Sequence, residues 1–225
     1  MIKCVSVSNM RDSDAHTITN YVPGLELMHR AAFGVFKSFD WKGPVAIVVG
    51  SGNNGGDGFA LACILQEQGI PCTVFTVSSR LSEDSAYYAE KAKLAGVPIF
   101  TFTEGCLNGY QAVVDCLLGT GFSGSLRENY RTAIEAINNS GAFVISVDIN
   151  SGMNGDTGCC EQAVQSDLTV TIGYVKNGLI TENAGRYMRR LVCADIGIVL
   201  VREEGIITAE TCPPWLDMNI ISAYE

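Results

Sequence analysis

A glycine-rich segment between an apolar run and a helical pattern is the strongest structural signal in this chain. Residues 44–49 read PVAIVV, a short apolar run typical of a buried parallel strand. The segment GSGNNGGDGFALA follows directly at 50–62 and predicts a turn and then a helix over 57–68, which Gly69 ends. Glycines there allow positive φ and close approach of a ligand, and a helix N-terminus offers free N–H groups to an anion. We therefore expect an anion-binding strand–turn–helix unit.

The rest of the chain alternates between helix-like and strand-like patterns. Two N-terminal helices are expected, over 8–19 with Ser8 and Asn9 as candidate caps, and over 25–39. Because later strands are separated by helices, the pattern predicts a parallel sheet covered on both faces. The predicted fold class is α/β, a Rossmann-like three-layer α/β/α sandwich with a mostly parallel central sheet and N-terminal helices, in one domain over residues 1–225. The further helices are expected over 83–95 and around Tyr130, Ile134 and Ile137, and the strands over 72–77, 97–102, 112–118, 143–148, 168–172 and 191–196.

The amino-acid composition limits which binding partners and which cellular compartment we expect for this protein. Apolar residues make up 47% of the chain and charged residues 17%, so a packed core is expected. A net charge of −9 argues against nucleic acid or an anionic membrane as the main partner. The nine cysteines are irregularly spaced and accompany only two histidines, which favours reduced thiols over a zinc site. Because the first residues lack an apolar signal core and no apolar run approaches a membrane span, we expect a cytoplasmic protein.

Polar side chains follow three of the expected strands at the point where each strand ends. Loops at the carboxyl ends of parallel strands converge on one crevice, and a set made only of oxygen ligands suits a hard cation. Each aspartate alone is better explained as a helix cap or a turn residue, whereas the convergence of the three loops favours a site. Lys176, in TIGYVKNGLI, ends another expected strand. By itself such a lysine is more often a solvated surface charge, but next to carboxylates in a cleft it could pair with a phosphate or steer a proton. The polar set is Asn53, Asn54, Asp57, Asp115, Asp148 and Ser151.

Several of these segments together resemble the YjeF N-terminal domain family, the NAD(P)H-hydrate epimerases, in its standalone form. The matching segments are VSNMRDSDAHTI, GLELMHRAA, GSGNNGGDGFALA, DCLLGTGFSGSLRENYRTAIEAINNS, VDINSGMNGDTG, TVTIGYVKNGLI and ADIGI, in the family's order and spacing. The resemblance implies a Rossmann-like fold, usually homodimeric, that binds hydrated NADH or NADPH and one potassium ion per subunit. It also implies functional coupling to a separate dehydratase, because we expect no C-terminal dehydratase domain in this chain.

Carried over by position, the resemblance assigns the family's binding residues to three loops of this sequence. It places potassium near Asn54, Asp115 and Ser151. The sequence departs from the family pattern at two positions. Asn150 stands where the family usually has proline, and the loss of the ring would loosen the turn before Ser151. His29 stands where the family commonly has an acidic residue. The substrate residues are Asn53, Asn54, Gly55, Gly56, Asp57, Gly119, Thr120, Gly121, Phe122, Ser123, Gly124, Ser125 and Asp148.

The implied reaction inverts the carbon that carries the added hydroxyl, C6 of the nicotinamide ring, between its R and S forms. The ring nitrogen can expel hydroxide to give an iminium-like cation, and water can return on the other face. An enzyme helps by moving protons and by placing negative charge near the cation. We expect Asp148 to be the main catalytic group and Lys176 the second candidate.

Two other classes of function stay open. Gly50, Gly52 and Gly55 satisfy G-x-G-x-x-G, and Arg80 could hold a 2′-phosphate, as in an NADP-dependent dehydrogenase. No Tyr-x-x-x-Lys or His-Asp constellation supports hydride transfer, however, and no Lys-Ser/Thr follows the glycines as a P-loop requires. The other class is a non-catalytic scaffold that binds nucleotide-like ligands. The retained Asp148 and GNNGGDG segment argue against it, and Asn150 leaves it open.

Overall fold

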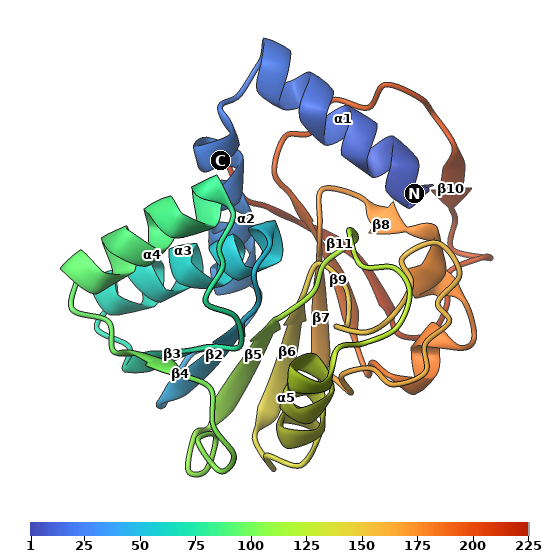
Figure 1. Cartoon of the computed structure of the whole chain (residues 1–225). Helices are drawn as coiled ribbons and strands as arrows, with labels where there is room; N and C mark the ends of the chain where they lie inside the picture. The colour runs from blue at the N-terminus through green and yellow to red at the C-terminus, as the bar shows by residue number, and fades with distance from the viewer. Residues whose placement is uncertain (225) are drawn as a thin grey trace.

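The centre of the protein is a parallel β-sheet (Figure 1). The computed structural model describes residues 1–224, in which eight strands pair in the order β11-β9-β7-β6-β5-β2-β3-β4, each pair parallel. The α/β prediction with a mostly parallel sheet is therefore confirmed. The strands are β2 (Val45–Val49), β3 (Cys72–Thr76), β4 (Ile99–Thr101), β5 (Ala112–Cys116), β6 (Phe143–Val147), β7 (Leu168–Ile172), β9 (Leu191–Asp195) and β11 (Leu216–Ser222).

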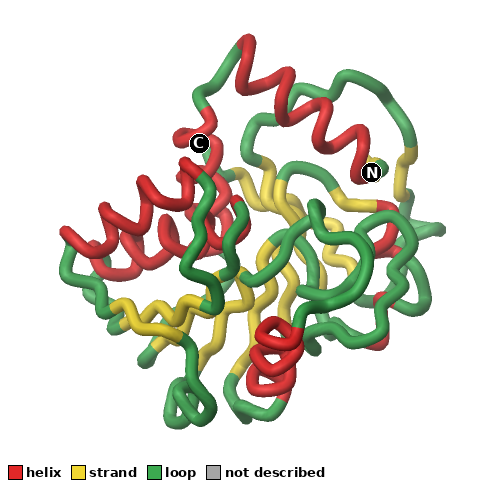
Figure 2. Tube along the Cα trace, in the orientation of Figure 1, coloured by secondary structure: helices red, strands yellow, loops and turns green. Residues whose placement is uncertain are grey.

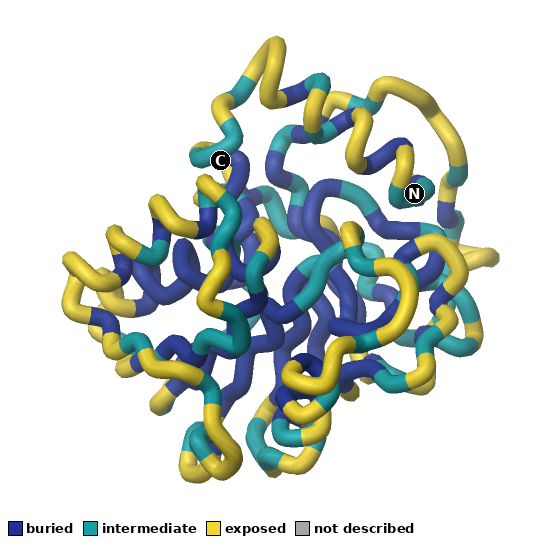
Figure 3. Tube along the Cα trace, viewed as in Figure 1, coloured by how far each residue is buried: buried dark blue, intermediate teal, exposed yellow. Residues whose placement is uncertain are grey.

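Helices cover both faces of this sheet, as the run of apolar residues in its strands requires. Helices α2 (Gly24–Lys37), α3 (Asn53–Glu67) and α4 (Glu83–Leu94) lie on one face, and α5 (Glu128–Asn138) lies on the other (Figures 1 and 2). In β2 the side chains of Val45, Ile47 and Val49 pack toward α3, while Ala46 and Val48 pack toward α5. Figure 3 shows the central strands as the most buried part of the chain. The three-layer prediction is confirmed.

A second, small sheet covers the end of the main sheet where β9 and β11 lie. It has the order β10-β1-β8, from β1 (Ile2–Val5), β8 (Val175–Lys176) and β10 (Gly205–Ile207), followed along the chain by the short helices η1 (Asn177–Ile180) and η2 (Ala184–Arg186). Its apolar residues share a core cluster with Leu191 and Cys193 of β9. Of its strands the sequence predicted only the one that Lys176 ends, because pieces of two to four residues carry too little periodicity.

Helix α1 (Val7–Asn20) begins where Ser6, not Ser8 or Asn9, caps it. The Ser6 hydroxyl accepts a hydrogen bond from the Asn9 amide at 3.2 Å, while Ser6 itself has extended backbone. Ser8 and Asn9 already lie inside the helix, so the prediction of these two as caps was wrong. The reason is that Asn9 has another partner, since its side-chain amide donates to the carbonyl oxygen of Arg202 at 2.9 Å.

The direction of the strand order reverses between β2 and β5. From β2 the chain moves through β3 to β4 on one side, and then returns to β5 and continues toward β11 on the other. Helix α3 therefore lies on one face and α5 on the opposite face. In such sheets the loops that leave the carboxyl ends of the two central strands separate and form a crevice. The crevice between β2 and β5 is where the candidate site lies.

Candidate functional site at the carboxyl ends of the strands

The glycines that follow β2 are needed for close packing. None of Gly50, Gly52, Gly55 and Gly56 is among the residues with positive φ in the described chain, so that part of the prediction was wrong. A Cβ atom on Gly50 would lie 1.9 Å from the carbonyl oxygen of Leu117, and one on Gly55 would lie 2.4 Å from that of Gly50. The first contact brings the ends of β2 and β5 together, and the second brings the start of α3 against the end of β2. A side chain at Gly50 would therefore push the two central strands apart, and one at Gly55 would push α3 away from β2.

Helix α3 begins at Asn53, four residues earlier than predicted, with Gly52 as its N-terminal flanking residue. The segment NNGG therefore belongs to the first turn of the helix rather than to a loop. Amide N–H groups of a first helical turn have no partner within the helix, and a negative ligand can accept hydrogen bonds from them. A Cβ atom on Gly52 would meet no atom within 4 Å, so the approach to this helix end is open.

Asp148 lies directly after β6 in a backbone conformation that is rare for a residue with a side chain. Its φ is 70°, which no other non-glycine residue shares among residues 1–224. One carboxylate oxygen accepts a hydrogen bond from the Thr120 amide at 3.1 Å, and the other lies 2.5 Å from the Lys176 ammonium. Such strained backbone is found most often at functional sites, where the surrounding contacts hold it in place.

Lys176 supplies a buried positive charge below Asp148. Its side chain is 1% exposed, and its ammonium group also donates to the Ile172 carbonyl oxygen at 2.7 Å and to the Thr171 hydroxyl at 3.1 Å. The ammonium thus has three acceptors, and the solvated-charge reading of this lysine is excluded. Lys176 therefore lies next to a carboxylate in a cleft, which is the setting in which a role toward a phosphate or a proton was expected.

Asp115, Ser151 and Asn54 converge on the carbonyl oxygen of Leu118. This oxygen lies 3.0 Å from Asn54 Nδ2 and 3.2 Å from the Ser151 hydroxyl. Fully buried Asp115 accepts hydrogen bonds from the hydroxyl and the amide of Ser151, and also from Ser146 and Leu117. Burial raises the pKa of Asp115, and these hydrogen bonds oppose the shift.

The side-chain oxygen of Asn54 is the feature here that fits a bound cation. Asn54 Oδ1 is buried and has no hydrogen-bond partner within residues 1–224. A buried acceptor without a partner is costly, and a cation is one group that would satisfy it. The Leu118 carbonyl and the Ser151 hydroxyl are further neutral oxygens near the Asn54 amide, and the Asp115 carboxylate lies behind Ser151. Such a donor set suits a hard cation of low charge. The described residues contain no group of three or more His, Cys, Asp or Glu side chains suited to a metal ion.

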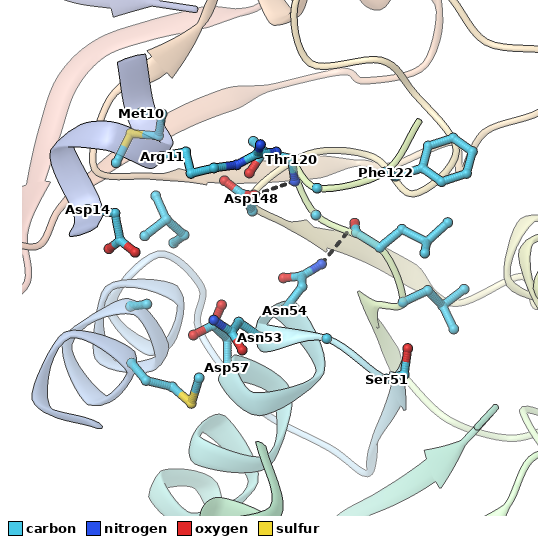
Figure 4. A pocket seen from close by; sticks show the side chains of 18 of the residues that line it. Met10, Arg11, Asp14, Ser51, Asn53, Asn54, Asp57, Thr120, Phe122 and Asp148 are labelled. Atoms are coloured by element: carbon cyan, nitrogen blue, oxygen red, sulfur yellow. Dashed lines mark hydrogen bonds between the residues drawn. The ribbon is translucent and has the colours of Figure 1, made fainter. Parts of the chain in front are cut away.

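A cavity of about 710 Å³ connects these elements. Figure 4 shows Asn53, Asn54 and Asp57 entering it from α3, Asp148 and Thr120 on its floor, and Asp14 of α1 opposite. Gly55, Gly56 and Gly124 are outside its lining, as are Asp115 and Ser151, which lie beneath it. The expected residues that line it are Asn53, Asn54, Asp57, Gly119, Thr120, Gly121, Phe122, Ser123, Ser125, Asp148 and Lys176.

One wall of the cavity was missed by sequence reasoning. Met10, Arg11, Asp14 and Ile18 of α1 line it, and Leu27, Met28 and Ala31 of α2 continue that wall. The spacing of the four α1 residues places them on one face of a helix, which was the available signal. This signal was weak because α1 carries polar residues on both faces, so no continuous apolar stripe identified the face that lines the cavity.

Two carboxyl groups in the cavity have raised pKa values. Burial raises the pKa of Asp57 well above its usual range, and the nearby negative charges of Asp148 and Asp14 add to the shift. Burial also raises the pKa of Asp14, again with a contribution from Asp148. Asp148, in contrast, has its positive partner at 2.5 Å. The cavity thus presents carboxyl groups in two kinds of surroundings.

The two departures from the family pattern have local explanations. Asn150 is fully buried, its Nδ2 lies within 2.9 to 3.0 Å of three oxygens, and its Oδ1 accepts from Thr169 at 2.7 Å. The expected loosening of the turn was therefore wrong, because side-chain hydrogen bonds hold the backbone in place of a proline ring. His29 lies on the exposed side of α2 and stacks on Phe33 with ring centroids 6.4 Å apart. Arg80, the candidate for a 2′-phosphate, is exposed and outside the cavity lining.

Comparison with known proteins places the chain in a family. Residues 24–178 match the family model of the YjeF-related protein N-terminus. A Limosilactobacillus reuteri protein named NAD(P)H-hydrate epimerase is 37% identical over 210 residues, which cover 88% of this chain and 98% of that protein. A Coxiella burnetii protein named bifunctional NAD(P)H-hydrate repair enzyme Nnr is 34% identical over 196 residues, 84% of this chain and 40% of that protein. The chain thus spans less than half of the bifunctional relative.

The fold has a counterpart among solved structures. The crystal structure of the yeast protein ynu0 superimposes with a TM-score of 0.74, covering 93% of this chain and 98% of that one at 19% identity. This likeness confirms the fold. Among residues 1–224 no helix is long and apolar enough to cross a membrane. With a family model that matches more than half of the chain and a full-length relative above 30% identity, this protein belongs to the YjeF-related protein N-terminus family.

Proposed function

We propose that this protein is an NAD(P)H-hydrate epimerase, an isomerase that interconverts the R and S forms of hydrated NADH and NADPH. One observation carries the proposal: the Asp148–Lys176 pair lies on the floor of a cavity at the carboxyl ends of the central strands. Membership of a family whose full-length relatives are named for this activity supports it.

The phosphates of the hydrated cofactor are assigned to the first turn of α3 and to the loop 119–125. Both present backbone N–H groups at the crevice, where a polyanion is stabilised despite the acidic chain. Arg11 and Arg127 line the same cavity and add positive charge to it. The nicotinamide ring is then directed to the floor, next to Asp148.

Asp148 is assigned the central role in the reaction. When the ring nitrogen expels the C6 hydroxyl, a positive charge develops on the ring, and a carboxylate beside it stabilises that charge. Each carboxylate oxygen already accepts one hydrogen bond, from Thr120 or from Lys176, and keeps a lone pair for water. Asp148 can therefore accept a proton from the water that adds to C6. Lys176 acts on Asp148 by holding it in place and is a positioning residue.

A potassium ion, one per subunit, is assigned to Asn54 Oδ1 and the Ser151 hydroxyl, with Asp115 supplying the opposite charge beneath them. When bound, it would supply positive charge that orders the loops around the substrate phosphates. Potassium, but not sodium, is then expected to raise the melting temperature, and Asn54→Ala is expected to abolish that rise. Stoichiometric zinc or iron in the purified protein would contradict this assignment.

The proposal extends to partners and compartment. The family resemblance supports a homodimer, which light scattering on the purified protein tests. An epimerase leaves the hydrate in place, so a separate dehydratase is the expected consumer of its product. Nine free cysteines within the described residues support a reducing compartment, and we place the protein in the cytoplasm.

The decisive experiment supplies the purified protein with the R hydrate of NADH or NADPH and follows the S form by chromatography. We expect the epimer ratio to relax much faster with protein than in buffer, without ATP and without net oxidation. If binding occurs but the ratio relaxes at the buffer rate, the non-catalytic scaffold is the correct reading. Oxidation of an alcohol substrate with bound NADP would instead favour the dehydrogenase, which the exposed position of Arg80 argues against.

A further inference from the structure

Asp57 occupies an unusual position among the carboxyl groups of the cavity. It lies in the first turns of α3, half-buried, and Figure 4 shows it between Asn53 and the wall that carries Asp14. Within residues 1–224 no hydrogen bond or ion pair engages its carboxyl group. A desolvated carboxyl group without a partner favours its protonated form, and a protonated carboxyl group is a hydrogen-bond donor.

Burial and the nearest negative charges favour the protonated form of Asp57, while the charge of Lys176 opposes it. Helix α2 lines this part of the cavity only with apolar side chains, Leu27, Met28 and Ala31. Burial and two negative neighbours raise the pKa of Asp57, and Lys176 opposes the shift. The titratable and charged groups around it are Arg11 and Asp14 of α1, Asp84 and Tyr88 of α4, Cys116 of β5, Asp148 after β6 and Lys176 of β8.

Epimerisation at C6 has a geometric requirement that one carboxylate does not meet. The hydroxyl leaves from one face of the ring, and water returns on the other face. Departure needs a proton donor, and return needs a proton acceptor on the opposite side. Asp148 and Asp57 come from different elements, the loop after β6 and helix α3, and enter the cavity from different directions (Figure 4).

We propose that Asp57 is the catalytic proton donor to the departing C6 hydroxyl, and that Asp14 is a positioning residue that keeps Asp57 protonated. The inference rests on the proposed function. In the step, the Asp57 proton passes to the C6 oxygen, the C6–O bond electrons leave with it as water, and the nitrogen lone pair forms the C=N bond. Water then attacks C6 from the other face, its proton passes to Asp148, and the π electrons return to nitrogen. Exchange with solvent water restores both carboxyl groups, and the reverse reaction exchanges their roles.

The first test is Asp57→Asn, which keeps the shape of the side chain and removes the transferable proton. We expect kcat to fall by about 10²- to 10⁴-fold while the affinity for the hydrate changes little, because general acid catalysis has that typical size. Asp57→Glu, which retains a carboxyl group, is expected to recover part of the activity. Glu67→Gln makes the same carboxyl-to-amide change at the exposed far end of α3 and is the matched control, with unchanged kcat.

The second test uses pH, because only the protonated form of Asp57 donates. Activity of the wild-type protein is expected to fall as pH rises through the raised pKa of Asp57. Asp14→Asn removes a negative neighbour and thereby lowers the pKa of Asp57. The fall of activity on the alkaline side of the pH profile should therefore occur at lower pH in this variant. Asp12→Asn, on the exposed side of the same helix, is expected to leave the limb in place.

Thermal unfolding gives a readout that needs no activity. A carboxyl group with a raised pKa in the folded state stabilises the fold fully only below its ordinary pKa of 3.8, and this stability is lost as pH rises through the folded-state pKa. Asp57→Asn should therefore melt at a higher temperature than wild type, by a margin that grows from pH 4 to pH 8. If wild type does not epimerise, the proposed function fails, and the role of Asp57 fails with it. If wild type epimerises and Asp57→Asn stays within a few-fold of it, or gains no stability at pH 8, only the role of Asp57 is lost.

Discussion

The two walls of the cavity are built in different ways. The wall formed by the start of α3 depends on backbone contacts that allow no side chain, as at Gly50 and Gly55. The wall formed by α1 depends on polar side chains, because Asn9, Ser13 and Thr17 are buried and bond to the backbone of segment 199–202. The wall formed by α3 therefore holds its side chains at fixed positions. Helix α1, in contrast, can separate from segment 199–202 when water replaces a few hydrogen bonds.

This difference has an energetic basis. Backbone atoms in close contact cannot move apart without disturbing β2 and β5, both fully buried in the central sheet. A side-chain hydrogen bond contributes a net amount of only about 0.5–1.5 kcal/mol, because water replaces it. The wall formed by α3 is therefore the rigid side of the cavity, and the wall formed by α1 is the side that opens more readily. Asp148 and Lys176 form the floor of the cavity between the two walls and belong to neither. Replacement of Asp148 has the largest expected effect on turnover.

Asp148→Asn tests whether the floor or the walls carry the chemistry. We expect turnover to fall about 10²- to 10⁴-fold with little change in affinity, as for loss of an acid–base group. The fold should also lose about 3 kcal/mol, because Lys176 is left buried without its counter-ion. The double variant Asp148→Asn with Lys176→Met should recover stability but not turnover. Near-normal turnover in the single variant would move the chemistry to Asp57 or Lys176.

Gly50→Ala tests the fixed wall. The added methyl group would lie 1.9 Å from the Leu117 carbonyl oxygen, so we expect a loss of about 3 kcal/mol in the free energy of unfolding. Gly52→Ala, where a Cβ atom meets nothing within 4 Å, is the matched control and should cost about 1 kcal/mol or less through the helix cap. Urea denaturation measures both. Equal losses in the two variants would mean that the wall is not held by close packing.

Ser13→Ala tests the α1 wall and has the smallest expected effect. It removes the acceptor of the Val201 amide, 3.1 Å away, and we expect a loss of about 1 kcal/mol. Hydrogen exchange should become faster in α1 and in segment 199–202 while α3 remains protected. Thr19→Ala on the exposed side of α1 serves as the control and should not change exchange in segment 199–202. If exchange in α3 rises together with α1, the two walls open as one unit and the comparison fails.

Much of the fold could be predicted because burial on both faces leaves a clear pattern. The strand predicted over 168–172 is β7, and the helix predicted over 25–39 is α2 within two residues at each end. The edge strand β11 was missed because it alternates weakly, and the strands of the small sheet are too short. The start of α3 was placed too late because glycine disfavours helix locally, a preference that the close packing of Gly55 against Gly50 and of Gly58 against Val49 overrides.

The sequence by itself determined the succession along the chain of most strands and helices, the family resemblance, and the three loops from which polar residues approach one another. Periodicity and local motifs are properties of neighbouring residues, so they can be read along the chain. Only the tertiary structure decided which carboxyl group has a partner. Asp148 pairs with Lys176, Asp115 is enclosed by donors, and Asp57 has no hydrogen-bond or ion-pair partner among residues 1–224. The charge state of a side chain depends on burial and on neighbours distant in sequence, and these exist only once the chain has folded.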